Sequence, residues 1–246
     1  MTAADPVGAG CKATCAAPHY SEPMPDLTAG DERFRDDRGD ADPGVAAALD
    51  AYAAGTGGEH AVLLALADSR LLVPVVPVPG EDASEMALPS IVGADGRRAL
   101  PAFTSADTVR RWQPAARPVP VPAPGVWQSA VQESCAVVID IAGPVPIVVE
   151  GARLQALASG AQAPAMHQDP DVWQQVAAAA AEIAPGIRVR LTEGRGGLDF
   201  TLELAPPAGA ARPVPDEMAS QIADAAAAGL GGRVRAGIAV LVRPPD

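Results

Sequence analysis

The sequence predicts an α/β (α+β) protein with two folded units. From residue 43 to about 160, helix-like apolar periodicity alternates with short apolar runs, which indicates a mixed sheet flanked by helices. The turn-rich stretch "AQAPAMHQDP" then interrupts the pattern, and beyond it the order becomes α-β-β-α-β. We therefore predict a tail at 1–42, an α/β domain at 43–160 and a small α+β domain at 165–246.

The tail lacks periodicity. It carries the charge run "GDERFRDDRGDADPG", and low hydrophobicity with dense charge predicts disorder over residues 1–42. The first helix is expected over 42–55, with Asp42 as its N-cap and Pro43 at the first helical position. A second helix is expected over 58–70.

The first domain continues with strands. The apolar run 70–78 predicts a buried strand, and because Pro74 and Pro77 cannot donate to a ladder, part of it is expected at an edge or bulge. Residues 86–103 predict a hairpin that turns at Asp95-Gly96. The remaining elements are helices at 105–112, 123–134 and 151–160 and strands at 117–122, 135–141 and 145–150.

The second domain begins with a helix over 169–186, capped by Asp169 or Asp171. Strands at 187–193 and 198–204 alternate apolar and polar residues and flank a "GRGG" hairpin. A helix over 214–232 and a strand over 235–242 complete it. We expect the helices on one face of a small antiparallel sheet.

The composition excludes some partners. The 246 residues have a net charge of −12, and Lys12 is the single lysine. An acidic surface opposes nucleic-acid binding, which needs clustered Lys and Arg. No apolar run approaches the length of a membrane span, and three cysteines make no disulfide framework. We expect a cytoplasmic protein that binds neither nucleic acid nor membrane and needs no cofactor.

Ser105 is the first candidate site residue, because it lies in a strand-to-helix turn where many hydrolases hold a nucleophile. A glycine elbow is absent around it, and His60 is the only well-placed histidine nearby. The other interpretation is an N-cap at Thr104 or Ser105, with Thr104 and Asp107 forming a capping box. We predict the cap.

The same helix start supports a weaker binding hypothesis. Free N–H groups at a helix N-terminus bind anions, and Arg97 and Arg98 follow the predicted hairpin turn. An anionic metabolite or an acidic peptide end would then contact Arg97, Arg98, Thr104 and Ser105. Alternatively, the two arginines only solvate the turn.

Three other groups of residues are candidates for a functional role. Asp140 and Glu150 end strands, where acid/base carboxylates occur, although turn and cap roles fit them equally. Cys11, Cys15 and His19 lack a fourth ligand, so a flexible tail with incidental thiols is expected rather than a zinc site.

The tryptophans form the last group. Trp112, Trp127 and Trp173 fall on predicted helices, as core anchors or, if exposed beside a groove, as peptide-binding residues.

One resemblance unites these motifs. The string "EMALPSIVGADGRRALPAFTSADTVRRWQPAARPVPV" resembles the N-terminal domain of the SseB family of bacterial proteins, as do the elements before it and "AVVIDIAGPVPIVVEG" after it. Residues 43–160 carry the resemblance, and 170–242 resemble the C-terminal region more loosely. The resemblance implies no catalytic residue. It favours a non-enzymatic protein-interaction or regulatory module with protein partners, the alternative being a binder of anionic metabolites or an enzyme that uses residues 104–107.

Overall fold

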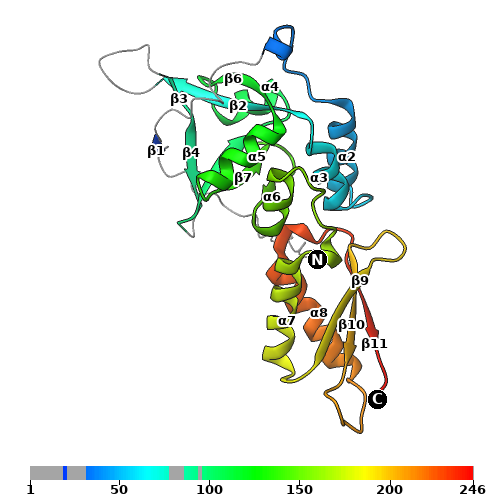
Figure 1. Ribbon diagram of the computed structural model, residues 1–246. Helices are drawn as coiled ribbons and strands as arrows, with labels where there is room; N and C mark the ends of the chain where they lie inside the picture. Colours follow the sequence, from blue (N-terminus) through cyan, green and yellow to red (C-terminus); the bar gives the residue numbers. More distant parts are fainter. Residues whose placement is uncertain (1–18, 21–31, 78–85, 94–95, 246) are drawn as a thin grey trace, which may run out of the picture.

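The computed structural model describes residues 19–20, 32–77, 86–93 and 96–245. The described residues form two lobes, each with its own hydrophobic core, and Figure 1 shows them one above the other. The core of the N-terminal lobe (residues 37–163) draws on residues from Val45 to Ala163, and that of the C-terminal lobe (residues 166–245) on residues from Met166 to Val242. The architecture is the α/β class that the sequence predicts.

The larger sheet of the N-terminal lobe is mixed. Its strand order is β1-β4-β5-β7-β8, and only β5 and β7 run parallel. The bounds are β1 His19–Tyr20, β4 Pro89–Val92, β5 Arg98–Ala102, β7 Ala136–Ile139 and β8 Ile147–Val149. The predicted hairpin is confirmed, since Ile91 lies opposite Ala99. Asp95 of its turn lies outside the described residues.

A second sheet explains how this lobe accommodates its prolines. It has the order β3-β2-β6, with β3 Met86–Ala87, β2 Arg70–Pro77 and β6 Arg117–Pro122. Pro118, Pro120 and Pro122 all occupy alternate positions of β6. Leu72 lies opposite Pro120, but its backbone N–H donates to the Phe103 carbonyl and not to β6. Leu72 and Pro120 are therefore a non-hydrogen-bonded pair, in which the backbone nitrogen of each residue points away from the other strand. The three prolines therefore face the outer edge of β6, where no ladder donor is needed.

In the described part of the N-terminal lobe, five helices cover the sheets. They are α2 Pro43–Ala53, α3 Glu59–Leu66, α4 Ala106–Trp112, α5 Ala123–Gln132 and α6 Gly151–Ala158. The Asp42 cap is confirmed, because its carboxylate accepts from the N–H of Gly44 at 2.8 Å. Trp127 of α5 anchors the core as expected: it is fully buried, and its indole N–H donates to the Ala67 carbonyl at 3.1 Å.

The end of the predicted tail needs correction. Residues 1–18 and 21–31, with Cys11 and Cys15, lie outside the described residues. Residues 37–40 instead pack on the N-terminal lobe: Asp37 forms an ion pair with Arg70 at 2.6 Å, and the Gly39 carbonyl accepts from Ala106 at 2.7 Å. The density of charge in this stretch predicts disorder, but the charge of Asp37 has a fixed partner in Arg70.

The C-terminal lobe has the predicted α-β-β-α-β order. Its elements are η2 Met166–Gln168, α7 Pro170–Ile183, β9 Arg188–Glu193, β10 Phe200–Ala205, α8 Asp216–Leu230, η3 Gly231–Arg233 and β11 Ile238–Val242. The helices lie together on one face of the sheet (Figure 1). The expectation of an antiparallel sheet is wrong for one pair, since β11 runs parallel to β10. The reason is α8, which carries the chain back before β11 begins.

α8 is the longest helix of the described residues, at 15 residues. Among the residues that the structure describes, no helix combines the length and the apolarity needed to cross a membrane.

Candidate functional site at the lobe junction

Ser105 is the N-cap of α4. Its backbone is extended, and its Oγ accepts from the Thr108 N–H at 3.3 Å. The predicted capping box is wrong, because Thr104 bonds to Asp140 while Asp107 pairs with Arg110. The hydrogen bond from Arg110 and its positive charge lower the pKa of Asp107. Cap chemistry therefore accounts for Ser105 without a nucleophile.

Asp140 joins the end of β7 to the start of α4. The residue is 4% exposed. It accepts from the Thr104 N–H at 2.9 Å, the Thr104 Oγ1 at 2.6 Å and the Thr108 Oγ1 at 2.7 Å. Asp140 also has a positive φ of 49°, a conformation that Asp tolerates better than most residues. Both of its oxygens therefore have structural partners.

The other predicted site residues lie at the opposite end of the same strands. Arg97 pairs with Glu150 at 2.5 Å, and Arg98 lies 3.7 Å from Glu133. Arg98 begins β5 whereas Ser105 follows the end of that strand, so at about 3.3 Å per residue they are roughly 20 Å apart. Asp140 and Glu150 are likewise separated, because β7 and β8 are antiparallel. The structure brings neither predicted cluster together.

The backbone N–H groups at the start of α4 donate to other groups of the chain itself. The Thr104 N–H donates to Asp140, the Ala106 N–H to the Gly39 carbonyl, and the Thr108 N–H to Ser105. Thr104 and Ser105 thus lie together at this helix start, with their polar groups bonded inside the lobe.

The cysteines and histidines form no metal centre in the part of the chain that the structure describes, where no group of three or more possible ligands gathers. Cys135 precedes β7 and is half-buried, and burial raises the pKa of its thiol. It packs against the core of the N-terminal lobe as a small apolar residue.

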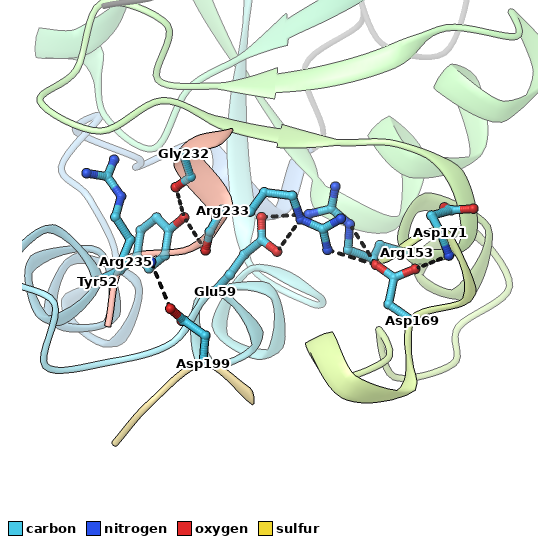
Figure 2. A network of polar contacts seen from close by, with 9 residues as sticks. All are labelled: Tyr52, Glu59, Arg153, Asp169, Asp171, Asp199, Gly232, Arg233 and Arg235. Carbon is cyan, nitrogen blue, oxygen red and sulfur yellow. Dashed lines mark hydrogen bonds and ion pairs between the residues drawn. The ribbon is translucent and has the colours of Figure 1, made fainter. Parts of the chain in front are cut away.

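A buried ion network lies between the two lobes, and Figure 2 shows two guanidinium groups between two carboxylates. Arg153 of α6 donates to Glu59 of α3 at 2.6 Å, and its Nε lies 3.6 Å from Asp169. Arg233 of η3 donates to Glu59 at 3.0 Å and to Asp169 at 2.8 Å. Each carboxylate therefore contacts both arginines, and Arg233 reaches the other lobe.

This junction network (Glu59, Arg153, Asp169 and Arg233) balances its charges away from water. The side chains of Glu59, Arg153 and Asp169 are 0 to 5% exposed. Such burial is tolerated only when charges are paired and hydrogen-bonded, and removal of one partner leaves an uncompensated charge. Burial opposes the charged form of Arg233, but Glu59 and Asp169 outweigh it and raise its pKa.

Helix ends position the acids. Glu59 is the first residue of α3, where the helix dipole favours a negative charge. Asp169 is the N-cap of α7 and also accepts from the Asp171 N–H at 2.9 Å. Asp171 in turn accepts from the Ala152 N–H at 2.8 Å and so caps α6 from the first turn of α7. Gly151 permits this approach, because a Cβ there would overlap the Asp171 carboxylate.

A loop of the C-terminal lobe extends the junction to α2. The Tyr52 hydroxyl donates to the Gly232 carbonyl at 2.8 Å, and the Arg235 guanidinium lies over the Tyr52 ring at 5.3 Å. Asp199 fixes that loop, since its carboxylate accepts from the Arg235 N–H at 2.8 Å (Figure 2) and from the Gly237 N–H at 3.0 Å. Burial, and then the charge of Glu59, raise the pKa of Tyr52.

Sequence reasoning missed this junction. Its members are far apart in the chain and belong to no recognised motif, and 174 residues separate Glu59 from Arg233. The one signal was the predicted cap of α7, for which the sequence offers Asp169 or Asp171. Asp169 has that role, but a helix cap gives no indication of a second set of partners.

Residues 45–156 match the family model for the SseB protein N-terminal domain. The chain contains an SseB N-terminal domain. The matched range includes Glu59 and Arg153, whereas Asp169 and Arg233 follow it. The junction network thus joins the family domain to the lobe behind it. Searches of curated proteins and of solved structures gave no match.

Proposed function

We propose that this protein is a non-enzymatic interaction or regulatory module that binds a protein partner through Trp173. The observation that carries the proposal is the exposure of Trp173, which is 49% although tryptophan is usually largely buried. Exposed tryptophans are enriched among the residues that dominate binding energy at protein interfaces.

The position of Trp173 supports this role. It lies in the first turns of α7, where its backbone N–H donates to the Asp169 carbonyl at 3.0 Å. Val172 and Val176 of the same helix are fully buried and anchor it in the core, so Trp173 lies at the margin of the buried face. The junction network fixes the same helix end through Asp169. A partner would therefore meet an indole whose backbone is already ordered, which lowers the entropy cost of binding.

The partners of the candidate reactive side chains also support a binding role. Ser105, Asp140 and Glu150 were the candidates for chemistry, and each has a structural partner. A catalytic serine needs a base, whereas the Ser105 Oγ contacts the Thr108 hydroxyl at 3.2 Å.

The test starts with co-purification of the tagged full-length protein from its native cells. The recovered partner is then purified, and its affinity is measured by calorimetry against three proteins: wild type, Trp173→Ala and Leu64→Ala. Leu64 is the matched control, since it is 41% exposed on α3 of the other lobe.

We expect stoichiometric binding that Trp173→Ala weakens by at least about tenfold and Leu64→Ala leaves unchanged. Two results would contradict the proposal. One is an unchanged affinity for Trp173→Ala. The other is recovery of no partner while the purified protein turns over a metabolite.

A further inference from the structure

β11 presents an open sheet edge. Among the described residues it pairs only with β10, in the order β11-β10-β9. Its sequence "IAVLV" holds no charge and no proline. Val240 and Leu241 are 39% and 42% exposed. An uncharged edge strand with exposed apolar side chains is a template for pairing with another strand.

The other described sheet edges carry the usual protection against such pairing. β9 has Arg188, Arg190 and Glu193 along its length, and β6 places three prolines outward. The remaining edge strands are short: β8 has three residues, and β1 and β3 have two each. Charges, prolines and short strands are the devices that prevent edge-to-edge association. β11 has five residues and none of these devices.

The hydrogen-bond pattern shows which groups are available. The Gly237 carbonyl accepts from Asp199, and the Arg243 N–H donates to Leu204. In a parallel pair, alternate residues bond to the neighbouring strand. The odd-numbered residues of this strand therefore face β10, and the N–H and C=O groups of Ile238, Val240 and Val242 point to the open side.

We infer that β11 pairs antiparallel with β11 of a second copy of this chain, about a two-fold axis at Val240. Ile238 of one copy then lies opposite Val242 of the other, and Val240 opposite Val240. Every outward N–H and C=O group of the strand finds a partner in this register, so the edge is self-complementary as a two-fold interface requires. The two sheets join into one.

Charge is compatible with a second copy. The chain has a net charge of −12, yet this strand opposes no like charges when it meets itself. At each end, Arg243 lies opposite Gly237 of the second copy, whose N–H donates to the Asp199 carboxylate. Arg243 forms an ion pair with Glu203 of its own chain at 3.0 Å, and Arg235 is directed over the Tyr52 ring. Each of these bases therefore has a partner within its own copy, and the pairing brings no two like charges directly opposite.

The interface is small, so we expect a weak dimer with a dissociation constant on the order of 10 μM. The inference is independent of the proposed function, because it concerns copies of this chain and leaves Trp173 on α7 accessible. A protein that stays monomeric would contradict this inference and would leave the proposed binding of a partner protein unaffected.

Sedimentation velocity of the full-length protein from about 1 to 300 μM is the first test. Wild type is expected to shift from monomer to dimer, and Val240→Lys to raise the dissociation constant at least tenfold. The matched control is Val148→Lys, which places the same charge at a 42% exposed valine on the edge strand β8. It should dimerise like wild type. A wild-type monomer at all concentrations, or equal effects of both lysines, overturns the inference.

Disulfide trapping tests the register even if Val240→Lys fails to fold. In this register, residue 239 lies opposite residue 241 of the second copy in a non-hydrogen-bonded pair, where Cβ atoms are close enough to bridge. In a background with Cys11, Cys15 and Cys135 changed to Ser, Ala239→Cys with Leu241→Cys should give a covalent dimer on oxidation. The control, Arg190→Cys with Thr192→Cys on β9, should not. Equal cross-linking of both pairs contradicts the register.

Discussion

The Nε of Arg233 donates to the Glu59 carboxylate at 3.0 Å across the boundary between the two lobes. Glu59 lies in the SseB N-terminal domain and Arg233 beyond it. Because the pair is mostly buried, neither charge can return to water unless the lobes separate. The junction therefore fixes the position of α7 and its exposed Trp173 relative to the family domain.

The approach of Asp171 to Gly151 gives a sharp stability prediction. Gly151→Ala puts a Cβ into the Asp171 carboxylate and strains a φ of +59°, whereas Gly160→Ala strains a φ of +76° with nothing within 4 Å. We expect Gly160→Ala, which strains φ alone, to lower the free energy of unfolding by about 1–2 kcal/mol. Gly151→Ala should lower it by clearly more. Urea unfolding measures both.

The control for this prediction is Asp171→Ala. In the Asp171→Ala background, Gly151→Ala should cost no more than Gly160→Ala does in wild type. Equal costs of the two glycine substitutions in wild type would show that Asp171 does not occupy the space beside Gly151.

A rescue experiment distinguishes a helix-capping role of Ser105 from a nucleophilic one. Ser105→Ala removes the cap of α4 and should lower the free energy of unfolding by about 1 kcal/mol, while Ser105→Asn should recover most of it, because Asn caps helices well. Denaturant midpoints of the three proteins test this. A nucleophile would instead be lost equally in both variants, with no fall in stability for Ser105→Ala.

Alkaline pH probes the junction through Tyr52. Burial and the charge of Glu59 raise its pKa in the folded protein, so its stabilising contribution is complete below the unfolded pKa of about 10. It is lost as pH rises through the folded pKa. Few other groups titrate there, since the chain has two tyrosines, three cysteines and the single Lys12.

The comparison is with Tyr52→Phe. At pH 8 this variant should be about 1 kcal/mol less stable, because the hydrogen bond to Gly232 is lost. Between pH 8 and 11 its unfolding free energy should fall less steeply than that of wild type. Cys135, whose pKa is also raised, contributes equally to both proteins. Parallel curves would count against a titrating Tyr52 at the junction.

Local patterns were sufficient for most of the fold. Pro43 after Asp42 placed α2, the Asp-Gly turn placed the β4–β5 hairpin, and the α-β-β-α-β order of the second lobe was correct. These features depend on residues close in sequence. The parallel direction of β11 was missed, because periodicity predicts a strand and not the direction of its neighbour.

The site was harder to predict for the same reason. Ser105 as a cap is a local property and could be inferred. The partners of Asp140 and the meeting of Arg153 with Glu59 across 94 residues depend on tertiary packing. A buried charged residue is also rare, and no local pattern marks Glu59 or Arg153 as one.

The central claim is that the junction network binds the two lobes together. A double-mutant cycle with Glu59→Gln, Arg233→Met and their combination measures it directly, with urea unfolding as the readout and the exposed Glu32→Gln as the neutral control. We predict that each junction variant loses about 3 kcal/mol and that the pair couples by about 2 kcal/mol. Additive losses, with a coupling below about 0.5 kcal/mol, would contradict an energetic connection between the lobes at this site.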